Sequence, residues 1–185
     1  ILHEFGHALH GILAEGTYST LTGTNVARDF VELPSQIMEN WAYEPEHLNS
    51  FAKHYQTGEV ITQDLIDKII AAKNFLAGYM NVRQLNYGLT DMSWHNVTSV
   101  PEASVVEYEQ GVLANSAVLP AIEGIVFSPS FSHIFSGGYA AGYYSYKWAE
   151  VLEADAFSLF KERGIFNREV AAEFRDKILS RGGIE

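Results

Sequence analysis

The sequence contains no cysteine, which excludes disulfide bonds and thiolate metal sites. Any metal ion would therefore have to be held by histidine and carboxylate side chains. Basic residues are scarce as well: 12 lysines and arginines stand against 23 aspartates and glutamates, giving a net charge of −11. This charge disfavours a nucleic acid partner, because the phosphates would be repelled. No apolar run reaches the roughly 18 residues of a membrane span, so we expect no membrane partner either.

The composition is that of a globular chain with a core of its own. Its 185 residues are 47% hydrophobic and 13% aromatic, and apolar residues recur at helical spacing while strand-like alternation never persists. We therefore expect an all-α fold, with a loop over 17–27 and an irregular segment over 115–136. The expected helices are 1–14, 29–41, a short one between Pro45 and Gly58, 62–89 with Thr62 as N-cap, 101–114, 139–163, and a last one capped by Asn167.

The first residues carry the strongest chemical signal, His3-Glu4-Phe5-Gly6-His7, an H-E-x-x-H pattern. On a helix, residues i and i+4 share one face, so His3 and His7 could hold one Zn²⁺ at about 2.0–2.1 Å each. Glu4 is placed to take a proton from a water molecule whose pKa the metal lowers towards ~7. The competing interpretation is two surface histidines, but the apolar residues around them predict a largely buried helix, and buried histidines need partners.

A catalytic zinc usually has a third protein ligand. His10 lies too far along the helix, and Leu13 stands where the metzincin pattern requires its third histidine. A glutamate on a second helix is the remaining common solution. Glu32 and Glu39 share a helical face there, although Glu32 could instead cap that helix and Glu39 could instead orient a histidine.

Two segments together resemble the thimet oligopeptidase family of zinc metallopeptidases, with its oligopeptidase A and peptidyl-dipeptidase subgroups. The H-E-x-x-H motif is followed 25 residues after His7 by Glu32, within the segment Arg28-Asp29-Phe30-Val31-Glu32-Leu33-Pro34-Ser35-Gln36. This resemblance implies that Glu32 is the third zinc ligand, beside His3 and His7.

The second segment, His133 to Tyr146, resembles the family's Gly- and Tyr-rich substrate segment. The resemblance implies transition-state roles for His133, Tyr143 and Tyr146, and substrate-binding roles for Tyr139, Gly137 and Gly138. Tyr139, Tyr143 and Tyr146 are spaced to line one helical face, where a hydroxyl could donate to a developing oxyanion. The competing interpretation is an aromatic stripe packed in a core; the two glycines, which let backbone approach a ligand, favour the substrate role.

Together these observations predict a zinc-dependent peptidase of short, unfolded oligopeptides, of oligopeptidase or peptidyl-dipeptidase type. Residues 1–185 would be the helical C-terminal portion of a zincin-type catalytic domain, truncated upstream and weakly active or inactive alone. Surface exposed by the truncation should favour self-association. We expect a cytoplasmic protein. The alternative is a non-catalytic, metal-binding helical module, which would have no need of Glu4.

Overall fold

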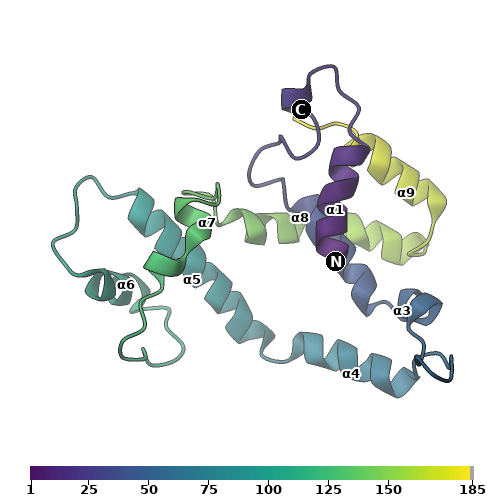
Figure 1. Cartoon of the computed structure of the whole chain (residues 1–185), viewed down its shortest axis with the longest axis horizontal. Helices are drawn as coiled ribbons and strands as arrows, with labels where there is room; N and C mark the ends of the chain where they lie inside the picture. The colour runs from purple at the N-terminus through teal and green to yellow at the C-terminus, as the bar shows by residue number, and fades with distance from the viewer. Residues whose placement is uncertain (184–185) are drawn as a thin grey trace. The chain divides into compact units, whose positions relative to one another are not determined.

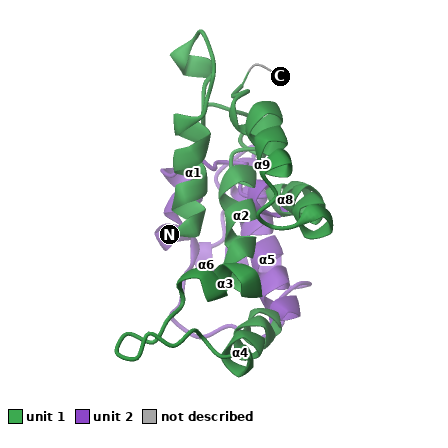
Figure 2. Ribbon diagram, turned by 90° about the vertical axis from the view of Figure 1, so that its right-hand side faces the viewer, with its two compact units in different colours: residues 1–75, 148–185 green, residues 76–147 purple. Residues whose placement is uncertain are grey.

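The computed structural model describes residues 1–183, and its regular secondary structure is helical (Figure 1). Within this range the one β-type pairing is an isolated antiparallel bridge between Lys53 and Val60, so the all-α expectation is confirmed. The chain divides into two compact units (Figure 2). Unit 1 holds residues 1–75 together with the segment from Trp148 onward, and unit 2 holds residues 76–147. No described helix is both long enough and apolar enough to cross a membrane.

Unit 1 contains the N-terminal helices and the C-terminal end of the chain. Its elements are α1 (Leu2–Ile12), η1 (Ser19–Leu21), α2 (Leu33–Glu39), η2 (Asn40–Tyr43), α3 (Pro45–Phe51), α4 (Gln63–Asn74), α8 (Ser145–Arg163) from Trp148 on, α9 (Arg168–Phe174) and the π-helix η4 (Arg175–Leu179).

The ends of these helices follow local sequence signals closely. Pro34 and Pro45 stand in the first turns of α2 and α3, where a missing N–H group costs nothing. The Thr62 side chain accepts the Leu65 N–H, which confirms the expected cap of α4, and Asn167 caps α9 in the same way. The expected helix over 29–41 is shorter in the structure, because residues 29–32 form turns before α2 begins at Leu33.

Aromatic and aliphatic side chains together form the core of unit 1. Trp41 packs edge-on against Phe157 and Phe160, with ring centroids 4.9 and 5.0 Å apart, and donates its indole N–H to the Ile165 carbonyl at 3.2 Å. Ile37 adds the buried face of α2 to this core. Residues far apart in sequence thus fix α2 against the end of α8.

The burial of α1 is less complete than its apolar sequence predicts. Only Gly6 and His10 are buried, while Ile1, Phe5 and Ile12 are exposed. The expectation of a largely buried helix is therefore wrong for residues 1–183, because α2 covers one face of α1 and no described element covers the stripe that carries these three side chains.

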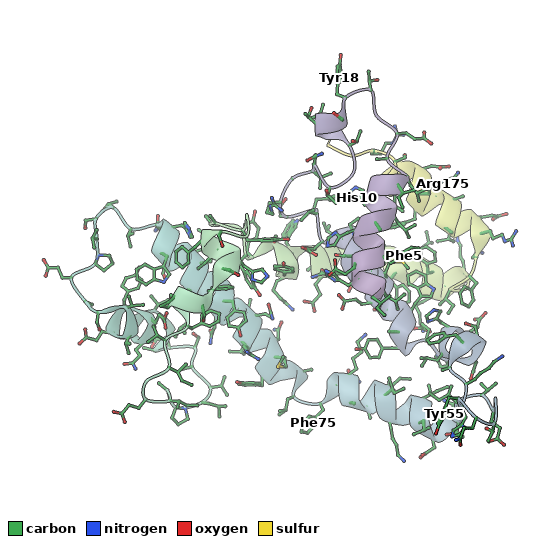
Figure 3. All side chains as sticks on the ribbon, in the orientation of Figure 1. Phe5, His10, Tyr18, Tyr55, Phe75 and Arg175 are labelled. Atoms are coloured by element: carbon green, nitrogen blue, oxygen red, sulfur yellow. The ribbon has the colours of Figure 1, made fainter. Side chains whose placement is uncertain are left out.

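Unit 2 contains α5 (Ala77–His95), α6 (Val105–Leu113), η3 (Ser128–Ser130), α7 (Ser132–Phe135) and the first residues of α8. The single helix expected over 62–89 is in fact two, α4 and α5, separated at Phe75 and Leu76 (Figure 3). Leu76 adopts a left-handed conformation with φ 55°, which ends the helical path although the apolar periodicity continues. The helix expected from Pro101 begins at Val105 instead, where Ser104 is the N-cap and forms a capping box with Glu107 in the first turn.

Buried carboxylates hold the irregular parts of unit 2 in place. Glu109 on α6 accepts the backbone N–H groups of Phe127 and Ser128. Asp91 on α5 accepts those of Ala141 and Tyr143. The helix expected over 139–163 begins only at Ser145, and residues 140–144 form turns. The prediction that Tyr139, Tyr143 and Tyr146 share one helical face is therefore wrong in its geometry.

Candidate functional site

The two histidines of the H-E-x-x-H motif lie on one face of α1, as their spacing predicts. Their ring centroids are 5.1 Å apart and the rings are edge-on to each other. Both side chains are partly exposed, so an ion held between them could be reached from solvent.

Glu32 faces this pair from the residue just before α2. Its Oε2 atom lies 3.4 Å from His3 Nε2 and 3.3 Å from His7 Nε2, and one ligand atom from each residue lies within 4.8 Å of the other two. Ligands about 2.0–2.1 Å from a tetrahedral Zn²⁺ are separated from one another by about 3.3–3.4 Å. The two distances from the carboxylate to the imidazole nitrogens therefore match those between ligands of one zinc ion, and the donor set of two imidazoles and one carboxylate is one that zinc accepts.

The position of Glu32 is fixed by its neighbours rather than by a capping role. Its side chain makes no capping hydrogen bond to α2, which contradicts the alternative of a helix cap. Only 2% of its surface is exposed, and Ser35 Oγ lies 2.8 Å from Oε2 and 2.9 Å from the Glu32 carbonyl oxygen. A buried carboxylate needs such partners, and a positive ion would stabilise it further.

The close approach of α1 to α2 depends on Gly6. A Cβ atom at this position would lie 2.1 Å from the Pro34 carbonyl oxygen and 2.6 Å from Ser35 Cα, both backbone atoms. Only glycine therefore allows the two helices to meet at the distance that brings Glu32 to the histidines.

Glu39 supports the cluster from the C-terminal end of α2, about two turns beyond Glu32. Its Oε1 atom lies 2.7 Å from His3 Nδ1, which leaves His3 Nε2 directed at Glu32. Such a partner fixes the ring orientation of a metal-binding histidine. The second of the two roles considered for Glu39, orienting a histidine, is thus the one the structure shows.

Two further titratable residues of α1, Glu4 and His10, lie outside the three-residue cluster. Glu4 is exposed beside the histidines. His10 is fully buried, with neither ring nitrogen hydrogen-bonded within residues 1–183. Burial, aided by repulsion from His7, lowers the pKa of His10 and keeps it neutral.

In unit 2, the structure brings the four predicted aromatic substrate residues into one cluster. The His133 ring lies 5.9 Å from those of Tyr139 and Tyr143 and 6.4 Å from that of Tyr146, centroid to centroid. Tyr139 and Tyr146 stack at 5.1 Å. A turn thus achieves the clustering that a helical face was expected to provide.

The members of this cluster differ in their access to solvent. His133 is exposed and Tyr139 and Tyr146 are half-buried, whereas Tyr143 is buried. The Tyr143 hydroxyl donates to Gln84 Oε1 at 3.2 Å, and burial raises the pKa of this phenol. Tyr143 therefore supports the cluster from below its surface. Because Tyr146 is more exposed than Tyr143, it is the better placed of the two to donate a hydrogen bond to a ligand.

The backbone conformation requires glycine at both Gly137 and Gly138. A Cβ atom on Gly137 would lie 2.7 Å from His133 Cα, and Gly138 adopts φ 83°. They shape the turn after α7, which is a role that needs no ligand.

Three supporting residues were not predicted from the sequence: Ser35 beside the metal cluster of unit 1, and Gln84 and Asp91 beside the aromatic cluster of unit 2. Ser35 lies in the segment Arg28–Gln36 that contains Glu32, and its position three residues after Glu32 could have indicated the hydrogen bond between the two side chains. Asp91 and His95 form an i, i+4 pair on α5, but the partners of Asp91 at 141 and 143 are too distant in sequence to be inferred.

Known proteins resemble this chain over its whole length. The family model described as peptidase family M3 matches residues 1–185. This chain belongs to peptidase family M3. Among its relatives, oligopeptidase A of Escherichia coli is 49% identical across 100% of this chain and 28% of its own length. The dipeptidyl carboxypeptidase of Salmonella typhimurium is 47% identical across 98% of this chain and 27% of its own length.

A plant relative shows the same pattern. Organellar oligopeptidase A of Arabidopsis thaliana is 46% identical across 99% of this chain and 24% of its own length. The chain thus spans about a quarter of the length of the M3 relatives it matches, and the family resemblance drawn from its two motifs is confirmed.

Proposed function

We propose that this M3 chain carries the zinc site of a peptidase that hydrolyses short, unfolded peptides. The observation that carries the proposal is the convergence of His3, His7 and Glu32, with the Glu32 Oε2 atom 3.3–3.4 Å from both Nε2 atoms and all three ligand atoms within 4.8 Å of one another. When bound, zinc would polarise the scissile carbonyl and lower the pKa of the attacking water.

The protein's own acid–base chemistry falls to Glu4. Its carboxylate is exposed next to His3 on α1, where it can take a proton from the attacking water. The same group can then deliver that proton to the leaving amine, so one residue serves both halves of the hydrolysis.

Oxyanion stabilisation and peptide binding fall to the aromatic cluster of unit 2. Tyr146 has a neutral hydroxyl that can donate to the oxyanion as charge develops, and His133 supplies a second donor. Tyr139, stacked on Tyr146, would hold the peptide. Tyr143, which was also expected to act on the transition state, instead uses its hydroxyl on Gln84 and is assigned to support.

The substrate class follows from the relatives' names, which speak of oligopeptidases and of dipeptidyl carboxypeptidases. Both names describe action on peptides. We assign short peptides as the class shared by the two, without choosing internal cleavage over removal of a C-terminal dipeptide.

The test compares the complete wild-type protein with its Glu4→Gln variant on a quenched fluorogenic peptide, with zinc content measured in both. We expect cleavage by the wild type, and retention of zinc with loss of at least about 100-fold in kcat in the variant, since proton transfer contributes 10²–10⁴-fold. A wild-type protein that binds zinc but cleaves no peptide would instead establish the non-catalytic metal-binding module.

A further inference from the structure

Asp91 is the most completely buried acid of unit 2, with 0% of its surface exposed. Its Oδ1 atom accepts the Ala141 N–H at 2.9 Å and its Oδ2 atom accepts the Tyr143 N–H at 2.8 Å. His95, one helical turn further along α5, has its Nδ1 atom 2.8 Å from the same Oδ1. One carboxylate on a regular helix therefore binds two backbone groups of a turn about 50 residues away in sequence.

The turn that Asp91 binds is one that the chain would not favour by itself. Ala141 has φ 51°, a left-handed conformation that residues with a Cβ atom rarely adopt. Within the turn the Gly142 N–H donates to the Tyr139 carbonyl at 2.9 Å. The bonds to a charged acceptor are the stronger ones, so Asp91 has the larger part in holding Ala141 in this conformation.

The turn that Asp91 binds, residues 141–143, lies within the tyrosine segment, residues 139–146. Tyr143, whose N–H is held by Asp91, accepts the Tyr146 N–H at 3.3 Å as α8 begins. Tyr139 begins the turn, and its ring reaches back to stack on Tyr146 at 5.1 Å. A change in the backbone at 141–143 would therefore move Tyr139 and Tyr146 relative to each other.

We propose that Asp91 is a positioning residue, which sets the relative placement of Tyr139 and Tyr146 by fixing the backbone of the turn between them. Asp91 touches no substrate and acts through the two tyrosines. The effect on catalysis rests on the proposed function of Tyr139 and Tyr146. The clamp itself, meaning the two hydrogen bonds from the Ala141 and Tyr143 N–H groups to Asp91, can be measured without an activity assay.

The chain offers a matched control in Glu109. This residue is also a buried carboxylate of unit 2 that accepts two backbone N–H groups, those of Phe127 and Ser128. The segment it holds carries none of the residues assigned to the substrate. Phe127 packs in the same hydrophobic cluster as Tyr143 and Tyr146, but Glu109 makes no bond to the turn at 141–143. Loss of Glu109 should therefore weaken unit 2 while disturbing the placement of Tyr139 and Tyr146 much less than loss of Asp91 does.

The experiment uses the complete protein with the variants Asp91→Asn and Glu109→Gln. An asparagine keeps the shape but has a single acceptor oxygen, so one of the two N–H groups of the turn would face an amide NH₂ group. We expect kcat to fall about tenfold or more in Asp91→Asn, and to change no more than about twofold in Glu109→Gln, with zinc content unchanged in both.

A double-mutant cycle with Tyr146→Phe separates positioning from general destabilisation. If Asp91 acts through Tyr146, Asp91→Asn should lower kcat far less in the Tyr146→Phe background than in the wild type. Glu109→Gln should show no such dependence on the background. Equal losses of kcat from Asp91→Asn in the two backgrounds would overturn the proposal.

Amide hydrogen exchange supplies the readout that does not depend on activity. Asp91→Asn should accelerate exchange in residues 139–146 and leave 126–128 protected, and Glu109→Gln should do the reverse. An inactive wild-type protein would refute the proposed function, and in that case unchanged exchange at 139–146 is the result that overturns the clamp. Altered exchange with wild-type kcat would show that the clamp exists but positions nothing that matters to the reaction.

Discussion

Gly6 offers the sharpest test of how the metal cluster is built, because the same helix contains a second glycine in a different environment. A Cβ atom at Gly6 would lie 2.1 Å from the Pro34 carbonyl oxygen, whereas one at Gly11 would meet no atom within 4 Å. Gly6→Ala and Gly11→Ala are therefore the same chemical change on α1, one against backbone and one in open space.

The size of the effect follows from these distances. Real Cβ contacts are essentially never shorter than 3.0 Å, so α1 and α2 must separate by at least 0.9 Å, the difference between 3.0 and 2.1 Å, to accept an alanine at Gly6. Metal–ligand distances tolerate only about ±0.2 Å. The shift thus exceeds the tolerance of the site several times over, and Glu32 can no longer reach the ion shared with His3 and His7.

The stability of the two variants should move in opposite directions. Forcing extra volume into a packed contact costs about 1–3 kcal/mol, whereas replacing a glycine by alanine in an open helical position gains up to ~1 kcal/mol. We expect Gly6→Ala and Gly11→Ala to differ by about 1–4 kcal/mol in the free energy of unfolding.

The assay is zinc affinity by competition with a chelator, together with denaturant unfolding of the metal-free proteins. Gly6→Ala should lose more than the ~100-fold in zinc affinity that removal of an outer-shell partner costs, and Gly11→Ala should bind as the wild type does. Wild-type zinc affinity in Gly6→Ala would refute the claim that helix separation controls the cluster.

Three further predictions follow from single contacts. Glu39→Gln should lower zinc affinity about 10–100-fold by loosening the His3 ring, with little change in the melting temperature because Glu39 is itself half-exposed; calorimetric titration checks this. Ser104→Ala should cost about 1 kcal/mol of stability by removing the cap of α6. The hydrogen bonds from Ser104 lower the pKa of Glu107, so the folded state favours the ionised carboxylate. The stability that this preference contributes is present at neutral pH and is lost as the pH falls through the lowered pKa. Acid unfolding of Ser104→Ala should lack this pH-dependent loss of stability. The 185-residue chain should self-associate through the exposed apolar stripe of α1, and Phe5→Ser should shift light scattering towards the monomer.

How far the sequence could be read depends on how local each feature is. The helix starts at Pro45, Thr62 and Asn167 were predictable, because caps and first-turn prolines act within a few residues. The start of α2 was expected at residue 29, four residues before Leu33, where the helix begins. The break at Leu76 was not, because the apolar periodicity runs through it and only the left-handed backbone ends the helix.

In the candidate metal cluster, too, the local feature could be predicted from the sequence and the long-range one could not. The spacing of His3 and His7 sufficed to place two imidazoles on one helical face. The choice of Glu32 over Glu39 could not be made from spacing, since both share a face of the expected second helix. The short contacts between helices, through Gly6, place Glu32 Oε2 at the histidines and leave Glu39 behind His3.

The tyrosine segment shows the limit most clearly. The sequence by itself determined which residue types are available: two histidines at helical spacing, acids near them, and tyrosines beside paired glycines. The tertiary structure alone decided that those tyrosines gather around a turn rather than along a helix. The physical reason is that the group holding the turn, the Asp91 carboxylate, comes from about 50 residues away, and a burial-dependent bond across that distance leaves no periodic trace in the chain.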